Sequence, residues 1–396
     1  MNWRKSALVL GSALLVAASS GAAEIGVTDN AIKIGVHAAL TGPASFVGQG
    51  GKVGIDAAVA EINGNGGVNG RKLEIVYVDD RGSPDGGVSA VRRLVDDDKV
   101  FAVFGAGPSA STVSVVPLFQ QNGVPYLVSF ASDPRVLEKF TPNIYSGATV
   151  PQLDAIGSYA DFMVKDLKAK RVAMMVCDQP HCTSSAPILK GLLEKSGVHV
   201  TVSTYNTGDT DFTGQISQIK SATPDVIFLF GLAPDEGRII PGIKRSGLPQ
   251  PIVTDVSGSD LTVLRMAGPA AEGYYTFWFG GPQFYDDTSG AMGKFLASIR
   301  ANKIERPANT PNLYTLMAYA DIYVLAEAIR VGGKDVTRAG LLKSLDNSIK
   351  GFVPAAPNWG HAASIGSPRT FSATNHKGTT GAQPVVVKGG TFKPAR

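Results

Sequence analysis

The segment Gly105-Ala106-Gly107-Pro108-Ser109-Ala110-Ser111-Thr112 holds the residue types best suited to bind an anion. It follows an apolar, strand-like run and opens a helix-like stretch. Free backbone N–H groups and the positive end of a helix dipole would therefore converge on one point. Such a point suits a carboxylate, with the Ser109 hydroxyl as an added donor. Two other interpretations exist: Ser109 as a simple helix cap, and a dinucleotide fingerprint, whose acidic ribose partner is not convincing here.

The second chemically distinctive group is the cysteine pair Cys177 and Cys182. In an oxidising compartment two nearby cysteines tend to pair, so we favour a local disulfide. Two free thiols are one alternative. A metal site with His181 is the other, but two thiols and one imidazole leave such a site short of ligands. We therefore expect no metal and no cofactor.

The elements that must position these residues alternate between short β-branched runs and longer amphipathic stretches. Continuous apolar runs indicate strands buried on both faces, and β–α alternation predicts a parallel sheet wrapped by helices. In the first half we expect strands at 32–36, 73–78, 101–104 and 126–129, and helices at 52–62, 87–96 and 111–121. The rhythm restarts after Pro151, with strands at 171–176, 198–204, 225–230 and 251–254, and helices at 186–196, 215–221 and 236–246.

Beyond Gly273 the pattern changes. The sequence predicts an aromatic strand at 274–279, helices at 290–301, 311–331 and 337–344, and strand pieces near 369–371 and 384–387. The fold class is therefore α/β, with two doubly wound lobes. Ligands of such sheets bind outside the carboxyl ends of the strands, so two facing lobes would share one cleft.

Several short motifs of this chain form a recognisable string. Ile32-Lys33-Ile34-Gly35-Val36 and Leu40-Thr41-Gly42-Pro43 come first, and Gly66-Gly67-Val68-Asn69-Gly70-Arg71-Lys72-Leu73-Glu74 follows. Val124-Pro125 and Phe371…His376-Lys377-Gly378 continue the match. The string closely resembles the leucine/isoleucine/valine-type periplasmic binding proteins of ABC importers, over essentially the whole mature chain.

The resemblance implies a type I, Venus-flytrap fold in which the chain crosses between the lobes three times. The crossovers would fall near 146–151, 275–280 and 352–357. Lobe 1 would then hold residues 24–147 and 278–353, and lobe 2 residues 148–277 and 354–396. Closure would be a hinge motion around the solute, and the closed form would dock on a membrane permease.

The resemblance also implies first-lobe ligand contacts. Ser109, with Ala110 beside it, matches the serine that holds the ligand carboxylate in this family. In the turn Phe130-Ala131-Ser132, Ser132 matches a threonine that commonly reaches the ligand, and Phe130 is either an aromatic wall or ordinary packing. Val47 takes the place of a cleft tyrosine, for which Phe46 could substitute. Tyr319 matches another pocket tyrosine, although a core position fits its apolar helix equally well.

The second lobe departs most from the family pattern. Cys182 falls where a strand-end tyrosine is typical, and Leu232 where another tyrosine is common. The glutamate that pairs with the ligand's ammonium falls at Val256, with Asp255 next to it. A buried ammonium without a carboxylate is costly, so either Asp255 takes that role or the solute has no α-amino group. Amino acids and aromatic or aliphatic carboxylates are equal expectations, and a neutral amide-like or urea-like solute is a third.

The N-terminus predicts export. Arg4 and Lys5 precede a 12-residue apolar run, Ala7 to Ala18, and small residues follow up to Ala23. These are the three regions of a signal peptide cleaved after residue 23, and the run is shorter than the roughly 20 residues of a membrane span. The mature chain of 373 residues (396 minus 23) would act in the periplasm, and it exceeds the size of a single core.

Charge and motifs exclude several classes of function. The net charge of +4 falls to about +2 without Arg4 and Lys5, which leaves no footprint for nucleic acid or an anionic membrane. The sequence has no G-x-S-x-G or H-E-x-x-H motif, so we expect no enzyme. We expect a monomer that binds a small solute for the permease of an ABC importer. A ligand-sensing receptor protein with the same fold is the alternative.

Overall fold

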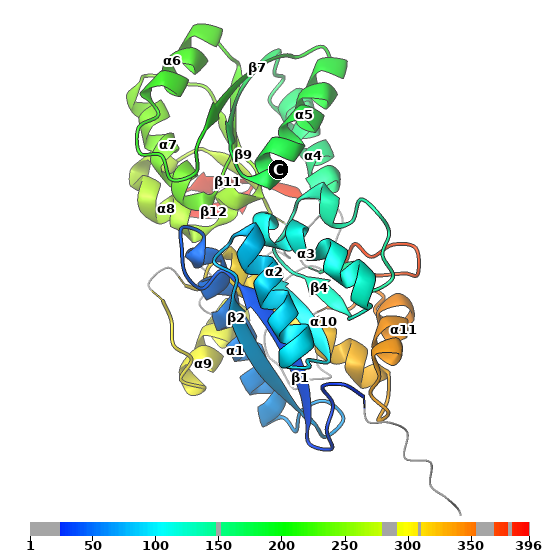
Figure 1. The fold of residues 1–396 in the computed structure, drawn as a ribbon. Helices are drawn as coiled ribbons and strands as arrows, with labels where there is room; N and C mark the ends of the chain where they lie inside the picture. Colours follow the sequence, from blue (N-terminus) through cyan, green and yellow to red (C-terminus); the bar gives the residue numbers. More distant parts are fainter. Residues whose placement is uncertain are drawn as a thin grey trace, which may run out of the picture.

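The computed structural model describes residues 24–147, 152–278, 291–307, 310–353, 368–378 and 382–395. The expected signal peptide, residues 1–23, lies outside them. The described chain forms two lobes, each a β-sheet flanked by helices, which lie end to end (Figure 1). Within the described ranges, no helix is both long enough and apolar enough to cross a membrane.

The first lobe holds a five-stranded, fully parallel sheet in the order β2-β1-β3-β4-β5. Its central strands are mostly apolar and almost completely buried, as a sheet covered on both faces requires. The strands are β1 Ala31–Ala38, β2 Lys72–Asp79, β3 Ala102–Ala106, β4 Tyr126–Val128 and β5 Ile144–Ser146.

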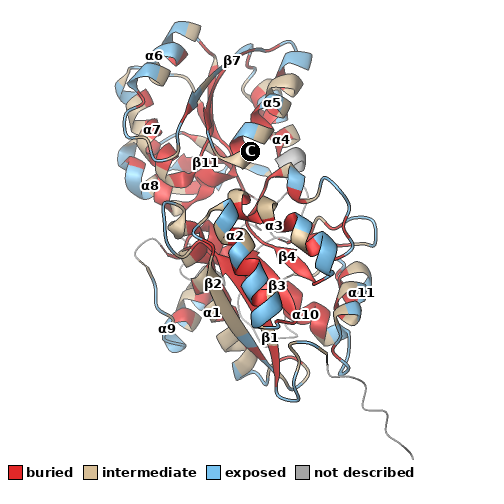
Figure 2. Cartoon of the chain, viewed as in Figure 1, coloured by how far each residue is buried: buried red, intermediate tan, exposed pale blue. Residues whose placement is uncertain are grey.

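Helices cover both faces of this sheet, and their exposed residues lie on the sides that face away from it (Figure 2). The helix α10 is buried along nearly its whole length and packs closely on α1, where Gly54 lies against the backbone of Thr315. The first-lobe helices are α1 Ser45–Gly64, α2 Pro84–Arg92, η1 Arg93–Asp97, α3 Ser109–Asn122, η2 Pro134–Val136, α9 Ala291–Ala301, α10 Leu313–Val331 and α11 Arg338–Ser348.

The second lobe holds a seven-stranded sheet in the order β12-β11-β10-β9-β8-β6-β7, parallel from β10 to β7 and antiparallel at the β11 and β12 edge. The strands are β6 Arg171–Cys177, β7 His199–Tyr205, β8 Val226–Phe230, β9 Ile252–Thr254, β10 Tyr275–Trp278, β11 Gln383–Lys388 and β12 Thr391–Pro394. The helices are α4 Gln152–Asp161, η3 Phe162–Asp166, α5 Pro180–Lys195, α6 Thr213–Ala222, α7 Ala233–Arg245, η4 Val256–Ser259, α8 Leu261–Ala267 and η5 Gly268–Ala271.

The C-terminal segment departs from the expected division into lobes. We expected everything after residue 353 in the second lobe, but residues 368–378 pack on the first. Arg369 is buried and pairs with Asp321 of α10 at 3.3 Å, and Lys377 bridges to Ser146 of β5. The final passage to the second sheet therefore follows residue 378, not residue 352. Residues 148–151, 279–280 and 354–357 of the three expected crossovers lie outside the described part of the chain.

Candidate functional site

The strand ends of the two sheets meet in one pocket between the lobes. In each sheet the chain order reverses beside a central strand, between β1 and β3 and again between β6 and β8. Such switch points are where open α/β sheets bind ligands. The pocket encloses about 490 Å³ of empty space, including the part that opens to solvent. Its walls are Val47, Pro108, Ser109, Phe130, Ser132, His181, Leu232, Val256, Ser257, Leu313, Tyr314 and Met317.

The turn after β3 brings hydrogen-bond donors to the first-lobe wall. Ser109 is the first residue of the 14-residue helix α3, and no side-chain hydrogen bond caps that end of the helix. The first N–H groups of a helix have no intrahelical partner, so they and the Ser109 hydroxyl are available to an anion. Ser132, from the turn after β4, lies on the same wall. The arrangement suits one carboxylate.

Aromatic rings form the apolar part of the first-lobe wall. The Tyr314 ring meets Phe130 edge to face, with ring centroids 5.1 Å apart, and meets Phe46 in the same way at 5.7 Å. A capping box between Asn312 and Thr315 fixes the start of α10, and therefore the position of Tyr314. Phe46 supports this wall from outside the pocket lining, whereas Val47 lies on the lining itself.

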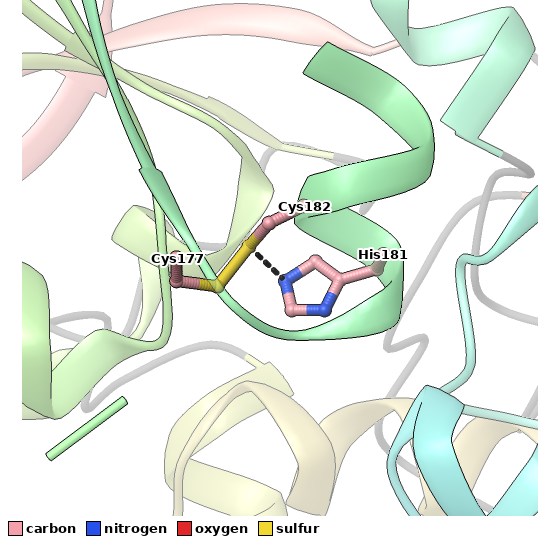
Figure 3. A group of neighbouring side chains, drawn as sticks. All are labelled: Cys177, His181 and Cys182. Carbon is pink, nitrogen blue, oxygen red and sulfur yellow. Dashed lines mark hydrogen bonds between the residues drawn. A yellow bond between two sulfur atoms is a disulfide. The ribbon is translucent and has the colours of Figure 1, made fainter. Parts of the chain in front are cut away.

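A disulfide shapes the second-lobe wall. Cys177, the last residue of β6, is bonded to Cys182 in the first turn of α5. His181 lies beside this bond, with its Nε2 atom 3.3 Å from the Cys182 sulfur and 3.4 Å from the carbonyl oxygen of Gly231 (Figure 3). Burial lowers the pKa of His181, against the opposing effects of that carbonyl group and the Asp133 charge. The ring is therefore neutral near pH 7.

The structure brings together only part of the set of residues suggested by the sequence. Ser109, Phe130, Ser132 and Leu232 line the pocket. The others, Ala110, Ala131, Phe46, Tyr319, Asp255 and Cys182, are not among its lining residues.

Three of those residues have other contacts in the structure. Tyr319 is buried in the core, and its hydroxyl donates to Glu61 at 2.7 Å. Asp255 is fully buried and accepts the Ser257 N–H at 2.9 Å as a helix cap. Cys182 is held in the disulfide, and its neighbour His181 takes the wall position.

Sequence reasoning missed several lining residues. His181 was considered only as a metal ligand, and Ser257, Leu313, Tyr314 and Met317 were not considered at all. The polar, Pro-bounded turn Asp178-Gln179-Pro180-His181 directly after β6 was the available signal for His181, because turns after parallel strands reach the ligand.

Acidic residues lie behind the second-lobe wall. Burial raises the pKa of Glu236 and of Asp260, and the charges of Asp255 and Asp235 raise that of Glu236 further. All of these carboxyl groups are outside the lining. Among the described residues that line the pocket, none carries a carboxylate, an ammonium or a guanidinium group.

A model of the family described as periplasmic binding protein matches residues 31–391. The chain therefore belongs to the periplasmic binding protein family, and within it resembles the Leu/Ile/Val-binding type. It is 29% identical over 310 residues to Leu/Ile/Val-binding protein homolog 2 of Brucella abortus, covering 77% of this chain and 79% of the relative. It is 27% identical over 312 residues to an amino acid binding protein of Pseudomonas aeruginosa, covering 78% and 81%.

Solved structures show the type I fold. The leucine binding protein LivK from Thermotoga maritima superposes with a TM-score of 0.77 at 21% identity, covering 92% of this chain and 98% of that one. The branched-chain amino acid transporter substrate binding protein LivJ from Streptococcus pneumoniae, solved with isoleucine, gives a TM-score of 0.75 at 22% identity, with the same coverage.

Proposed function

We propose that this chain is an exported, non-catalytic binding protein that captures a small carboxylate-bearing solute between its lobes and delivers it to an ABC importer. The observation that carries the proposal is the pocket itself. It combines uncapped helix donors and two serine hydroxyls on one wall with a largely apolar remainder. Family membership supports a periplasmic location and a transport role.

The solute's body should be apolar. Phe130, Tyr314, Leu232, Val256 and Met317 offer aromatic and aliphatic surface, and burial of such surface contributes about 25 cal/mol per Å². A branched aliphatic or aromatic acid of modest size fits this surface and the available space.

A branched-chain amino acid is the second candidate. The relatives are described as Leu/Ile/Val-binding or amino acid binding proteins, and acidic residues lie just behind the pocket wall. The difficulty is that no described lining residue supplies the carboxylate that a buried ammonium requires.

A thermal-shift screen of the refolded mature chain tests the proposal. The panel contains aliphatic amino acids, aromatic and aliphatic carboxylates, amides and urea. A solute at 100 times its Kd adds roughly 2.7 kcal/mol of stability. We expect carboxylates to stabilise the chain and their amides not to do so.

The variant Ser109→Asp should abolish this response, because it places a negative charge where the carboxylate binds. Ser114→Ala, on the same helix and outside the lining, is the matched control and should respond like the wild type. Stabilisation by amides or urea alone, or a full carboxylate response in Ser109→Asp, would overturn the proposal.

A further inference from the structure

We propose that His181 presents an unprotonated Nδ1 atom to the pocket as a hydrogen-bond acceptor, and that the solute carries a neutral O–H or N–H donor to meet it. The inference rests on the proposed function and narrows its solute class. That class becomes carboxylates with a hydroxyl or amide donor near the apolar body, such as hydroxy acids.

The partners of Nε2 determine which ring nitrogen carries the hydrogen. Nε2 faces the Gly231 carbonyl oxygen at 3.4 Å and the Cys182 sulfur at 3.3 Å. A carbonyl oxygen can only accept, and a disulfide sulfur has no hydrogen to donate. Nε2 must therefore be the donor, and in a neutral imidazole the other nitrogen is then an acceptor.

The hydrogen bonds of His181 within the described part of the chain are made by Nε2, and none by Nδ1. Figure 3 shows it on the side of the ring that turns away from the disulfide. His181 lines the pocket, so Nδ1 is available to a group of the solute. The hydroxyls of Ser109, Ser132 and Ser257 can rotate to donate or accept, but an unprotonated Nδ1 can only accept. An unprotonated Nδ1 therefore favours a solute that donates a hydrogen bond to it.

A neutral donor suits this position better than an ammonium group. The ring supplies a lone pair and no negative charge. Glu236 lies outside the pocket lining, and burial favours its protonated form. An ammonium group transferred from water into this pocket would have no charged partner. The free-energy cost of that transfer is far above the cost for a hydroxyl.

The disulfide acts as a positioning group for this acceptor. It joins the end of β6 to the first turn of α5, with Cα atoms 5.7 Å apart, and His181 is the residue next to Cys182. The bond therefore holds the turn that presents the ring. Its sulfur also occupies the Nε2 side, which leaves Nδ1 as the nitrogen for the solute.

The test uses three acids with one carbon skeleton: 4-methylpentanoate, 2-hydroxy-4-methylpentanoate and leucine. Calorimetric titration of the refolded wild-type chain should give about tenfold tighter binding for the hydroxy acid than for the plain acid, since one hydrogen bond contributes about 1.4 kcal/mol. His181→Phe should erase that difference, so that the two acids bind this variant with similar affinity. His181→Gln, whose amide oxygen can accept, should restore part of it.

The outcomes separate this inference from the function on which it rests. If none of the three acids binds at millimolar concentration, the carboxylate pocket fails and the inference fails with it. If the plain acid binds as tightly as the hydroxy acid, or if their difference survives in His181→Phe, only the role of His181 fails. Leucine binding most tightly in both proteins would also overturn it, in favour of an ammonium site.

A double-mutant cycle tests the positioning role of the disulfide. In the variant with both Cys177→Ser and Cys182→Ser, selectivity for the hydroxy acid should fall while affinity for the plain acid is kept. In the His181→Phe background the same serine substitutions should change neither affinity. An equal loss for both acids in both backgrounds would show that the bond only stabilises the fold. Circular dichroism melts establish that each variant is folded.

Discussion

Glu236 is fully buried in the first turn of α7, and neither carboxylate oxygen has a hydrogen-bond partner among the described residues. Its Oε2 atom lies so close to the turn after β9 that a methyl group on Gly258 would come within 3.0 Å of it. A buried carboxyl group without a partner is strongly disfavoured in its charged form. This explains why burial raises the pKa of Glu236.

The pH dependence of stability follows from that shift. Because the pKa of Glu236 in the folded chain is above its usual 4.5, the folded chain keeps a proton that the unfolded chain releases. The group adds stability that is fully present below pH 4.5 and is lost as the pH rises through the folded-state pKa. Glu236→Gln has no such titration, so its free energy of unfolding relative to wild type should increase from pH 5 to pH 8, by about 1–3 kcal/mol.

Urea unfolding at several pH values measures this difference. Glu194→Gln, at an exposed position on α5, is the matched control, and its effect should stay within about 0.5 kcal/mol at every pH. A difference for Glu236→Gln that does not depend on pH would contradict the assignment.

Single residues mark the limit of what the sequence could predict about the site. The placement of Ser109 on the pocket wall was predictable, because turns after parallel strands form the ligand-binding edge of such sheets. The residues of the second-lobe wall could not be predicted in this way. Between Cys182 and His181 one position decides which side chain faces the pocket, and sequence patterns do not fix a turn to one residue. Asp255 looked suitable beside Val256, but its side chain caps η4 instead.

At the scale of elements, a carboxylate of one lobe binds a helix end of the other. Asp260 caps α8 by accepting the Thr262 N–H at 2.7 Å, and its second oxygen accepts the N–H of Leu313, the first residue of α10, at 3.2 Å. The second bond joins the lobes beside the pocket. It can form only when they are close together, so it favours the closed form.

Asp260→Asn should weaken solute binding by about tenfold. An amide offers only one acceptor, so either Thr262 or Leu313 would face an N–H₂ group instead. A hydrogen bond to a charged group contributes about 1.5–3 kcal/mol, and part of that loss would appear as weaker closure. Titration with the tightest carboxylate of the screen measures the effect.

Asp211 provides the matched control, because it accepts the Thr213 N–H in the same local pattern on an exposed surface. Asp211→Asn should leave the affinity unchanged. Equal affinities for wild type and Asp260→Asn would show that this contact does not contribute to closure.

The longer elements were predictable because hydrophobic periodicity needs several residues to be visible. Strands such as β1, β6 and β8 and helix α10 appear within a few residues of the expected bounds. The sequence analysis did not identify β5 or β12, of three and four residues, or the seven-residue α8. Such short segments carry too few residues to show a period.

At the scale of the whole molecule, the two-lobe architecture followed from the repeated β–α rhythm and from the family resemblance. The position of the C-terminal segment could not be predicted from either of them. Its place on the first lobe depends on Arg369 meeting Asp321 and on His376 meeting the Ile144 carbonyl group. These partners are far apart in sequence, and no local pattern predicts such contacts.

Both lobes contribute walls to one pocket, and contacts such as Asp260 with Leu313 and Ser184 with Asp133 join them across it. The whole molecule therefore has the form expected when two lobes have closed around a small solute. The orientation of that solute is the central claim, since its carboxylate should face the first lobe and its donor group the second.

A crystal structure of the chain with the tightest-binding carboxylate of the screen tests this claim most directly. We predict one molecule between the lobes, with its carboxylate oxygens within hydrogen-bonding distance of the Ser109 hydroxyl and the first backbone N–H groups of α3. A carboxylate that instead faces the second lobe, or a solute bound outside the pocket, would contradict the account.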